Sequence, residues 1–262
     1  MCYPLGARPP DLPQGLPRPI AGGAGGEDAI VESADGTKFR VYLAPARSSE
    51  VGVVIAPDVR GLHPFYEELV ERFAQAGVHA MAFDYFGRTA GTDRRGDDFD
   101  HMPHVRETKS ETIQGDVAAT AAELRKRTDA RRVFVLGFCM GGRVAFNASA
   151  EQKDLAGVVG FYGRLSTREG EAGQAPKDRA PRMKAPILGL FGGADPGIPP
   201  SDIDAFREAL RRAHIPHGIR VYPGAPHSFF DRTFAEHRDA CDDAWRRVLA
   251  FMKDPDAAKA AA

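Results

Sequence analysis

Residues 131–142 read RRVFVLGFCMGG, and this stretch predicts a strand, a tight turn and the start of a helix. The run RRVFVL is typical of a short strand buried in a parallel sheet. The turn has the pattern Gly-x-Cys-x-Gly around Cys139, and the helical stretch RVAFNASA follows it. Glycines are needed in such a turn because a Cβ would collide with the crossing backbone. At the start of a helix the sulfur of Cys139 lies at the positive end of the helix dipole, which favours a thiolate.

Strand and helix patterns alternate on both sides of this stretch. Residues 28–43 predict a hairpin that turns at Asp35-Gly36, and residues 88–107 predict an irregular, polar loop. Further strands are predicted at 51–56, 78–83, 131–136, 155–161, 187–191 and 218–222, with helices at 64–77, 107–126, 202–213 and 236–253. This alternation predicts an α/β fold whose mostly parallel sheet is covered by helices on both faces.

The chain of 262 residues is long enough for one large α/β domain. We expect this domain to span residues 27–255. Residues 1–26 are rich in Pro and Gly without an apolar period, so they predict an arm or linker that buries little surface. Residues 256–262 are expected to form a C-terminal tail.

Composition excludes several classes of function. Lys and Arg total 35 against 36 Asp and Glu, and without a basic excess we expect no nucleic-acid partner. No apolar stretch approaches a membrane span or a signal peptide, so we expect no membrane partner. Three cysteines without a CxxC spacing predict neither disulfides nor a zinc site, and the histidine spacings predict no metal. We expect a cytoplasmic monomer or small homo-oligomer.

Two residues downstream stand where a site of this fold gathers. Asp195 follows the strand at 187–191, and His227 follows the strand at 218–222. Open α/β sheets bind their ligands at the carboxyl ends of strands. The chain order Cys139, Asp195, His227 is that of nucleophile, acid and histidine in α/β-hydrolase triads. The alternative interpretations are a buried structural cysteine and a turn-forming aspartate in Gly-Ala-Asp-Pro.

Five segments together resemble the dienelactone hydrolase family of α/β-hydrolases. They are VGVVIAPDVRG, AFDYFGRTAG, GFCMGG, FGGADPGIPP and PGAPHSFFD, within a match of about residues 28–253. Family members hydrolyse small lactones through a Cys-His-Asp triad. The resemblance therefore implies Cys139 as nucleophile, His227 as general base and acid, and Asp195 as the residue that orients the imidazole. It also implies an oxyanion hole formed by the backbone N–H groups of Val59 and Met140.

The resemblance also implies a substrate pocket, with departures from the family pattern. Asp58 stands where the family has a Glu that helps to form the thiolate. Arg88 stands where the family holds a substrate carboxylate, but Asp231 occupies the place of a second carboxylate-binding Arg. We consider Arg60 as a replacement for it. A pocket for neutral, apolar esters would instead rely on Phe86, Phe229 and Phe230.

The sequence thus predicts an enzyme that hydrolyses small carboxylic esters or lactones through a thioester, without cofactor or metal. Peptidase activity is disfavoured because an amide nitrogen is a poor leaving group. Dehalogenation is disfavoured because it usually needs a carboxylate at the position of Cys139. The alternative from another class is a non-catalytic binding or thiol-sensing protein on the same fold, which would form one adduct and stop.

Overall fold

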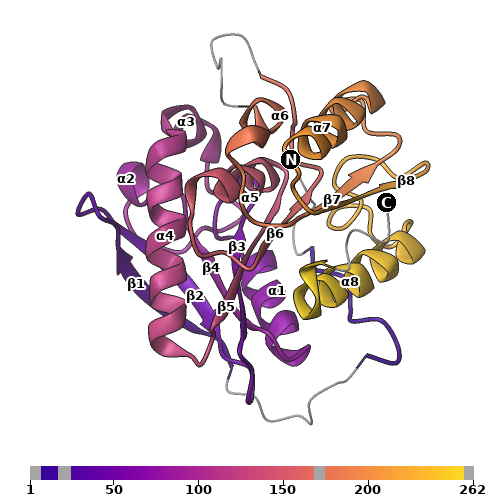
Figure 1. Ribbon diagram of the computed structural model, residues 1–262. Coiled ribbons are helices and arrows are strands. Elements are labelled where there is room, and N and C mark those ends of the chain that lie inside the picture. Colours follow the sequence, from indigo (N-terminus) through magenta and orange to yellow (C-terminus); the bar gives the residue numbers. More distant parts are fainter. Residues whose placement is uncertain (1–6, 17–24, 168–174, 257–262) are drawn as a thin grey trace.

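The computed structural model describes residues 7–16, 25–167 and 175–256 (Figure 1). One eight-stranded sheet has the order β1-β2-β4-β3-β5-β6-β7-β8. The strands are β1 (Glu27–Glu32), β2 (Lys38–Ala44), β3 (Val51–Ala56), β4 (His79–Phe83), β5 (Arg132–Phe138), β6 (Gly157–Phe161), β7 (Ile187–Gly192) and β8 (His217–Tyr222). β1 and β2 are antiparallel to their neighbours, and all pairs from β4 to β8 are parallel.

The central strands are apolar because both of their faces are covered. In β3 and β5 the register pairs Val54 with Val135 and Ala56 with Gly137, and all four residues are buried. This register brings the carboxyl ends of β3 and β5 to one edge of the sheet. The loop after β3 and the turn at Cys139 therefore meet there.

Helices lie on both faces of the sheet, as the sequence predicts, and the predicted α/β fold is confirmed (Figure 1). α1 and α8 share one face, where the rings of Phe73 and Trp245 pack with centroids 4.8 Å apart. α4, α5 and α7 cover the other face (Figure 1). The helices are α1 (Pro64–Gln75), α2 (Gly87–Ala90), α3 (His101–Glu107), α4 (Ser110–Arg127), α5 (Met140–Glu151), α6 (Pro176–Arg179), the 3₁₀ turn η1 (Ala180–Arg182), α7 (Pro200–Arg212) and α8 (Arg238–Lys253).

The segment 88–107 differs from the expected irregular loop, because most of α2 and all of α3 lie within it. Thr108 and Lys109 are extended and separate α3 from α4, so the helix predicted from residue 107 begins at Ser110 instead. Neither α2 nor α3 has a buried residue. Helices this short, without an apolar stripe, leave no periodic signal in the sequence.

Part of the predicted N-terminal arm packs onto the domain. Leu12 is buried, and the indole N–H of Trp245 on α8 donates to the Pro10 carbonyl at 3.3 Å. Arg8 forms an ion pair with Glu68 of α1 at 2.6 Å. The expectation that this arm buries little surface is therefore corrected for residues 7–16. Proline reduces the entropy lost on ordering, so a Pro-rich segment can dock with few apolar contacts. The remaining calls on residues 1–26 and 256–262 fall largely outside the described residues.

Within the described residues, no helix combines the length and apolar character needed to cross a membrane. The same residues hold no group of three or more His, Cys, Asp or Glu side chains arranged to hold a metal ion.

Candidate active site

Cys139 occupies the turn between β5 and α5 in a strained conformation. Its φ is 55° and its ψ is −112°, and α5 begins at the next residue, Met140. A Cβ on Gly137 would lie 1.9 Å from the Gly141 carbonyl oxygen, and one on Gly141 would lie 2.0 Å from the Ala56 oxygen. No side chain fits at either glycine, because the turn crosses the end of β3. Cys139 itself is partly exposed and lines a cavity of about 760 Å³.

His227 and Asp195 meet beside this cavity from two neighbouring strand ends. Nδ1 of His227 lies 2.6 Å from Oδ2 of the buried Asp195, whose Oδ1 accepts from the Gly197 N–H at 2.8 Å. Burial of the imidazole opposes its charge. Hydrogen bonds to Asp195 and Cys139, with the charges of both groups, outweigh that effect and raise the pKa of His227 to about 10. The structure thus brings the three residues of the expected triad together, and their geometry suits an imidazolium beside a thiolate.

Tyr162 is a site residue that sequence reasoning missed. It follows β6 directly, has a φ of 37°, and lines the cavity with Cys139. Its ring packs on the imidazole of His227, with centroids 4.9 Å apart, and its hydroxyl donates to Oδ2 of Asp231 at 2.8 Å. The signal that could have found it is its place at the carboxyl end of a parallel strand, as for Asp195.

Asp231 lies behind the cavity rather than in it. Only 1% of the residue is exposed, and besides Tyr162 it accepts from the Arg232 N–H. Burial and the charge of Asp58 raise the pKa of Asp231 to about 8, although the hydrogen bonds from Arg232 and Tyr162 act in the opposite direction. The charge of Cys139 raises it further. The charges of Asp58 and Cys139 therefore both act on the buried carboxyl group of Asp231.

Asp58 and Val59 follow β3 on the loop that faces the turn at Cys139. Asp58 is fully buried, with Oδ1 accepting from the Arg60 N–H at 2.8 Å and its own N–H donating to the Tyr66 hydroxyl at 2.9 Å. Val59 lines the cavity together with Met140, the first residue of α5. The first N–H groups of a helix have no acceptor within it, so the Met140 N–H is available to a ligand.

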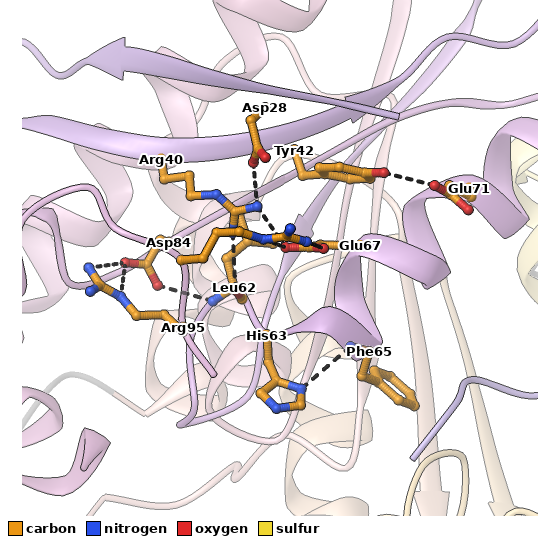
Figure 2. A network of polar contacts seen from close by, with 11 residues as sticks. Asp28, Arg40, Tyr42, Leu62, His63, Phe65, Glu67, Glu71, Asp84 and Arg95 are labelled. Carbon is orange, nitrogen blue, oxygen red and sulfur yellow. Dashed lines mark hydrogen bonds and ion pairs between the residues drawn. The ribbon is translucent and has the colours of Figure 1, made fainter. Parts of the chain in front are cut away.

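A buried polar network holds the loop after β3 at Leu62 (Figure 2). Oδ1 of Asp84 accepts from the Leu62 N–H at 3.0 Å, and Arg40 donates to the Leu62 carbonyl at 3.4 Å. Nε of Arg95 donates to the second oxygen of Asp84 at 3.0 Å, and Arg40 forms an ion pair with Glu67 at 2.6 Å (Figure 2). The backbone at Leu62, three residues after Val59, is therefore held from two sides, which restricts the loop after β3.

The structure does not bring Arg88 to the cavity. Its guanidinium forms a bidentate pair with Asp116 of α4, at 2.6 and 2.9 Å, and also bonds Asp35. Asp116 is fully buried, so it needs a cation nearby. The expected contact of Arg88 with a substrate carboxylate is corrected on this ground.

Arg60 is corrected in the same way, because its buried side chain points to another partner. It bonds Asp97 at 3.0 Å, and His63 bonds the same carboxylate oxygen at 2.6 Å. These contacts tie the loop after β3 to the segment that leads into α3. Arg60 thus holds the wall of the cavity in place and is not part of its described lining.

The three phenylalanines considered for an apolar pocket are part of the core. Phe86 is buried against Tyr85 and Phe99. Phe229 and Phe230 pack on the rings of Phe161 and lie outside the described lining of the cavity. The expectation that they contact substrate is corrected, because each ring is enclosed by other rings.

Comparison with known proteins agrees with this fold. The model of the dienelactone hydrolase family matches residues 39–255. A protein of Escherichia coli strain K12 named "Putative carboxymethylenebutenolidase" is 29% identical over 243 residues, which cover 87% of this chain and 88% of that protein. A protein of the same name from Saccharolobus solfataricus is 26% identical over 268 residues, covering 87% and 98%. The crystal structure of a "Putative Dienelactone Hydrolase" from Klebsiella pneumoniae superposes with a TM-score of 0.75 at 26% identity, covering 88% and 100%.

The fold and these relatives define a hydrolase of the α/β-hydrolase superfamily. The chain belongs to the dienelactone hydrolase family, because the family model spans most of its length. The resemblance seen in the sequence is thereby confirmed.

Proposed function

We propose that this enzyme hydrolyses small carboxylic esters or lactones with Cys139 as its covalent nucleophile. One observation carries the proposal: the imidazole of His227, bonded to Asp195 at 2.6 Å, shares a cavity with a cysteine held in a strained strand-to-helix turn. A nucleophile, a base and a group that orients the base are the parts that acyl transfer needs.

In the first half of the cycle, the thiolate of Cys139 attacks the ester carbonyl. The N–H groups of Met140 and Val59 receive the oxyanion that forms. The intermediate collapses when the carbon–oxygen bond breaks, and the imidazolium of His227 gives its proton to the departing alkoxide. The products are an alcohol and a thioester on Cys139, with a neutral imidazole.

In the second half, His227 removes a proton from water while the water oxygen attacks the thioester carbonyl. Collapse of this intermediate breaks the carbon–sulfur bond and releases the carboxylic acid. The thiolate and the imidazolium are then restored, so atoms and charges balance over the cycle. Asp195 holds the imidazole in the tautomer that both halves need.

The rival function is a thiol sensor that forms one adduct at Cys139 and stops. Turnover of 4-nitrophenyl acetate distinguishes the two, measured with the enzyme at known concentration. The proposal expects nitrophenol release to continue well beyond one equivalent, and to fall by several orders of magnitude in His227→Ala. Cys241→Ala is the matched control, because its thiol is buried and bonds the Phe229 carbonyl. Release of a single equivalent followed by arrest would favour the sensor.

A further inference from the structure

The cavity in front of Cys139 carries an excess of positive charge. Its described lining includes four basic side chains against one acidic side chain: Arg106, Lys109, Arg143 and Arg164 against Glu111. The whole chain is nearly neutral, with 35 basic and 36 acidic residues, so this excess is local. Clefts lined by charge of one sign concentrate ligands of the opposite sign.

Two of these basic residues lie close to the proposed triad along the chain. Arg143 lies in the first turn of α5, and its N–H donates to the Cys139 carbonyl at 3.3 Å. Arg164 follows Tyr162 by two residues, and the Tyr162 ring contacts His227. Each side chain therefore starts within a few residues of a group that we assign to the reaction.

The backbones that carry these two arginines touch. A Cβ on Gly163 would lie 2.6 Å from the Arg143 nitrogen and 2.5 Å from the Gly142 carbonyl carbon. The approach is possible because residue 163 has no side chain. Arg143 and Arg164 thus start from adjacent points on the same wall of the cavity, and both are partly exposed in it.

The two positions at which the family resemblance implies carboxylate binding are not available to bind a carboxylate in this chain. Arg88 is held by Asp116 and Asp35, and position 231 carries a buried acid. Arg164, in contrast, makes no hydrogen bond or ion pair with any residue in the described parts of the chain. Arg164 is partly exposed and lines the cavity, and a guanidinium has five donors to offer.

We propose that Arg143 and Arg164 form an anion-binding subsite that selects esters carrying a free carboxylate. This inference rests on the proposed function, since the subsite lies beside the proposed nucleophile. It places substrate recognition on the wall made by α5 and the segment after β6, away from Arg88. Arginine suits the role because its planar fork matches a carboxylate with two charge-assisted hydrogen bonds.

The test compares kcat/KM for mono-4-nitrophenyl esters of dicarboxylic acids with that for their methyl-capped, neutral analogues. Wild type is expected to prefer the anionic member. Arg164→Gln and Arg143→Gln should each lower that preference about tenfold or more, the size expected for one charged hydrogen bond. Arg211→Gln is the matched control, because it removes the same charge from an exposed site on α7.

Three outcomes overturn the subsite. Equal kcat/KM for both members in wild type, or a preference that both variants retain, would remove it while leaving the hydrolase intact. If neither ester is turned over, the proposed function fails. The subsite is then tested separately, by measuring how well a bound carboxylate protects Cys139. Hexanoate should then still protect Cys139 from iodoacetamide better than hexanamide does, and Arg164→Gln should abolish the difference. Equal protection by the two compounds would overturn the subsite.

Discussion

The hydroxyl of Tyr162 donates a hydrogen bond of 2.8 Å to the buried carboxyl group of Asp231, while the ring of Tyr162 packs on His227. The imidazole of His227 is thereby connected to an acid that lies outside the described lining of the cavity. Where the family resemblance implies an arginine, this chain has a carboxyl group behind an aromatic ring. We expect the pKa of Asp231 to affect how the stability of the fold depends on pH.

Asp231 should make the protein less stable at alkaline pH. Burial first, and then the charge of Asp58, raise its folded-state pKa from 3.8 to about 8. The folded state therefore binds a proton more tightly than the unfolded state, and the free energy of unfolding falls as pH rises from about 4 to about 8. The slope has an upper limit of about 1.4 kcal/mol per pH unit.

Urea unfolding of wild type and Asp231→Asn across this pH range measures the effect. The Asn side chain keeps an acceptor for Tyr162 and cannot ionise, so the variant should lose less stability on the way to alkaline pH. Asp98→Asn, at an exposed carboxyl group, is the control. Parallel pH profiles for wild type and Asp231→Asn would show that Asp231 does not titrate in this range.

Arg88→Met should destabilise the fold and leave the preference for anionic esters unchanged. The substitution leaves Asp116 buried without its bidentate partner, which costs about 3 kcal/mol. Arg88→Met with Asp116→Leu should recover most of this loss, because no uncompensated charge remains. Arg207→Met, which breaks an exposed pair with Asp204, should cost less than about 1 kcal/mol. A collapse of the anionic preference in Arg88→Met would instead return Arg88 to substrate binding.

The pair of His227 and Asp195 should set the alkaline limit of activity. With its pKa raised to about 10, the imidazole of His227 stays protonated through neutral pH and loses its proton as the pH passes about 10. We expect kcat/KM to persist through neutral pH and to fall near that alkaline limit. In Asp195→Asn the alkaline fall of kcat/KM should move to lower pH, and turnover should drop. If the fall stays at the same pH, another group is responsible for it.

Asp58 should tune the nucleophile without serving as the triad acid. The charges of Asp58 and Cys139 both act on Tyr162 and Asp231, so the two groups lie in one neighbourhood, and we expect the charge of Asp58 to oppose a negative charge at Cys139. Asp58→Asn should therefore shift the pH profile of Cys139 alkylation to lower pH. Asp195→Asn should mainly lower turnover, because the imidazole then loses its correct tautomer. An exchange of these two phenotypes would reverse the assignment.

The strands and the turn at Cys139 could be predicted from the sequence, because strands buried on both faces appear in it as unbroken apolar runs. The end of each parallel strand also marked Asp195 and His227. The rule that marked them applies equally to Tyr162, whose role depends on contacts with residues far along the chain.

The partners of charged side chains could not be predicted from the sequence. Arg88 pairs with Asp116, which lies 28 residues further along the chain on α4, and nothing local in the sequence indicates that contact. The docking of residues 7–16 depends likewise on contacts with α1 and α8, and the short helix α3 has too few residues to show a period. Local patterns predict elements, whereas tertiary packing decides which side chains meet.

The central claim is that Cys139 carries the acyl group during turnover. The most direct measurement is acid quenching of the enzyme during hydrolysis of excess 4-nitrophenyl acetate, followed by peptide mapping by mass spectrometry. We expect an acetyl thioester on Cys139, sensitive to hydroxylamine, none on Cys241, and no turnover in Cys139→Ala. Continued hydrolysis by Cys139→Ala, or turnover in wild type with the acetyl group on another residue, would contradict the account.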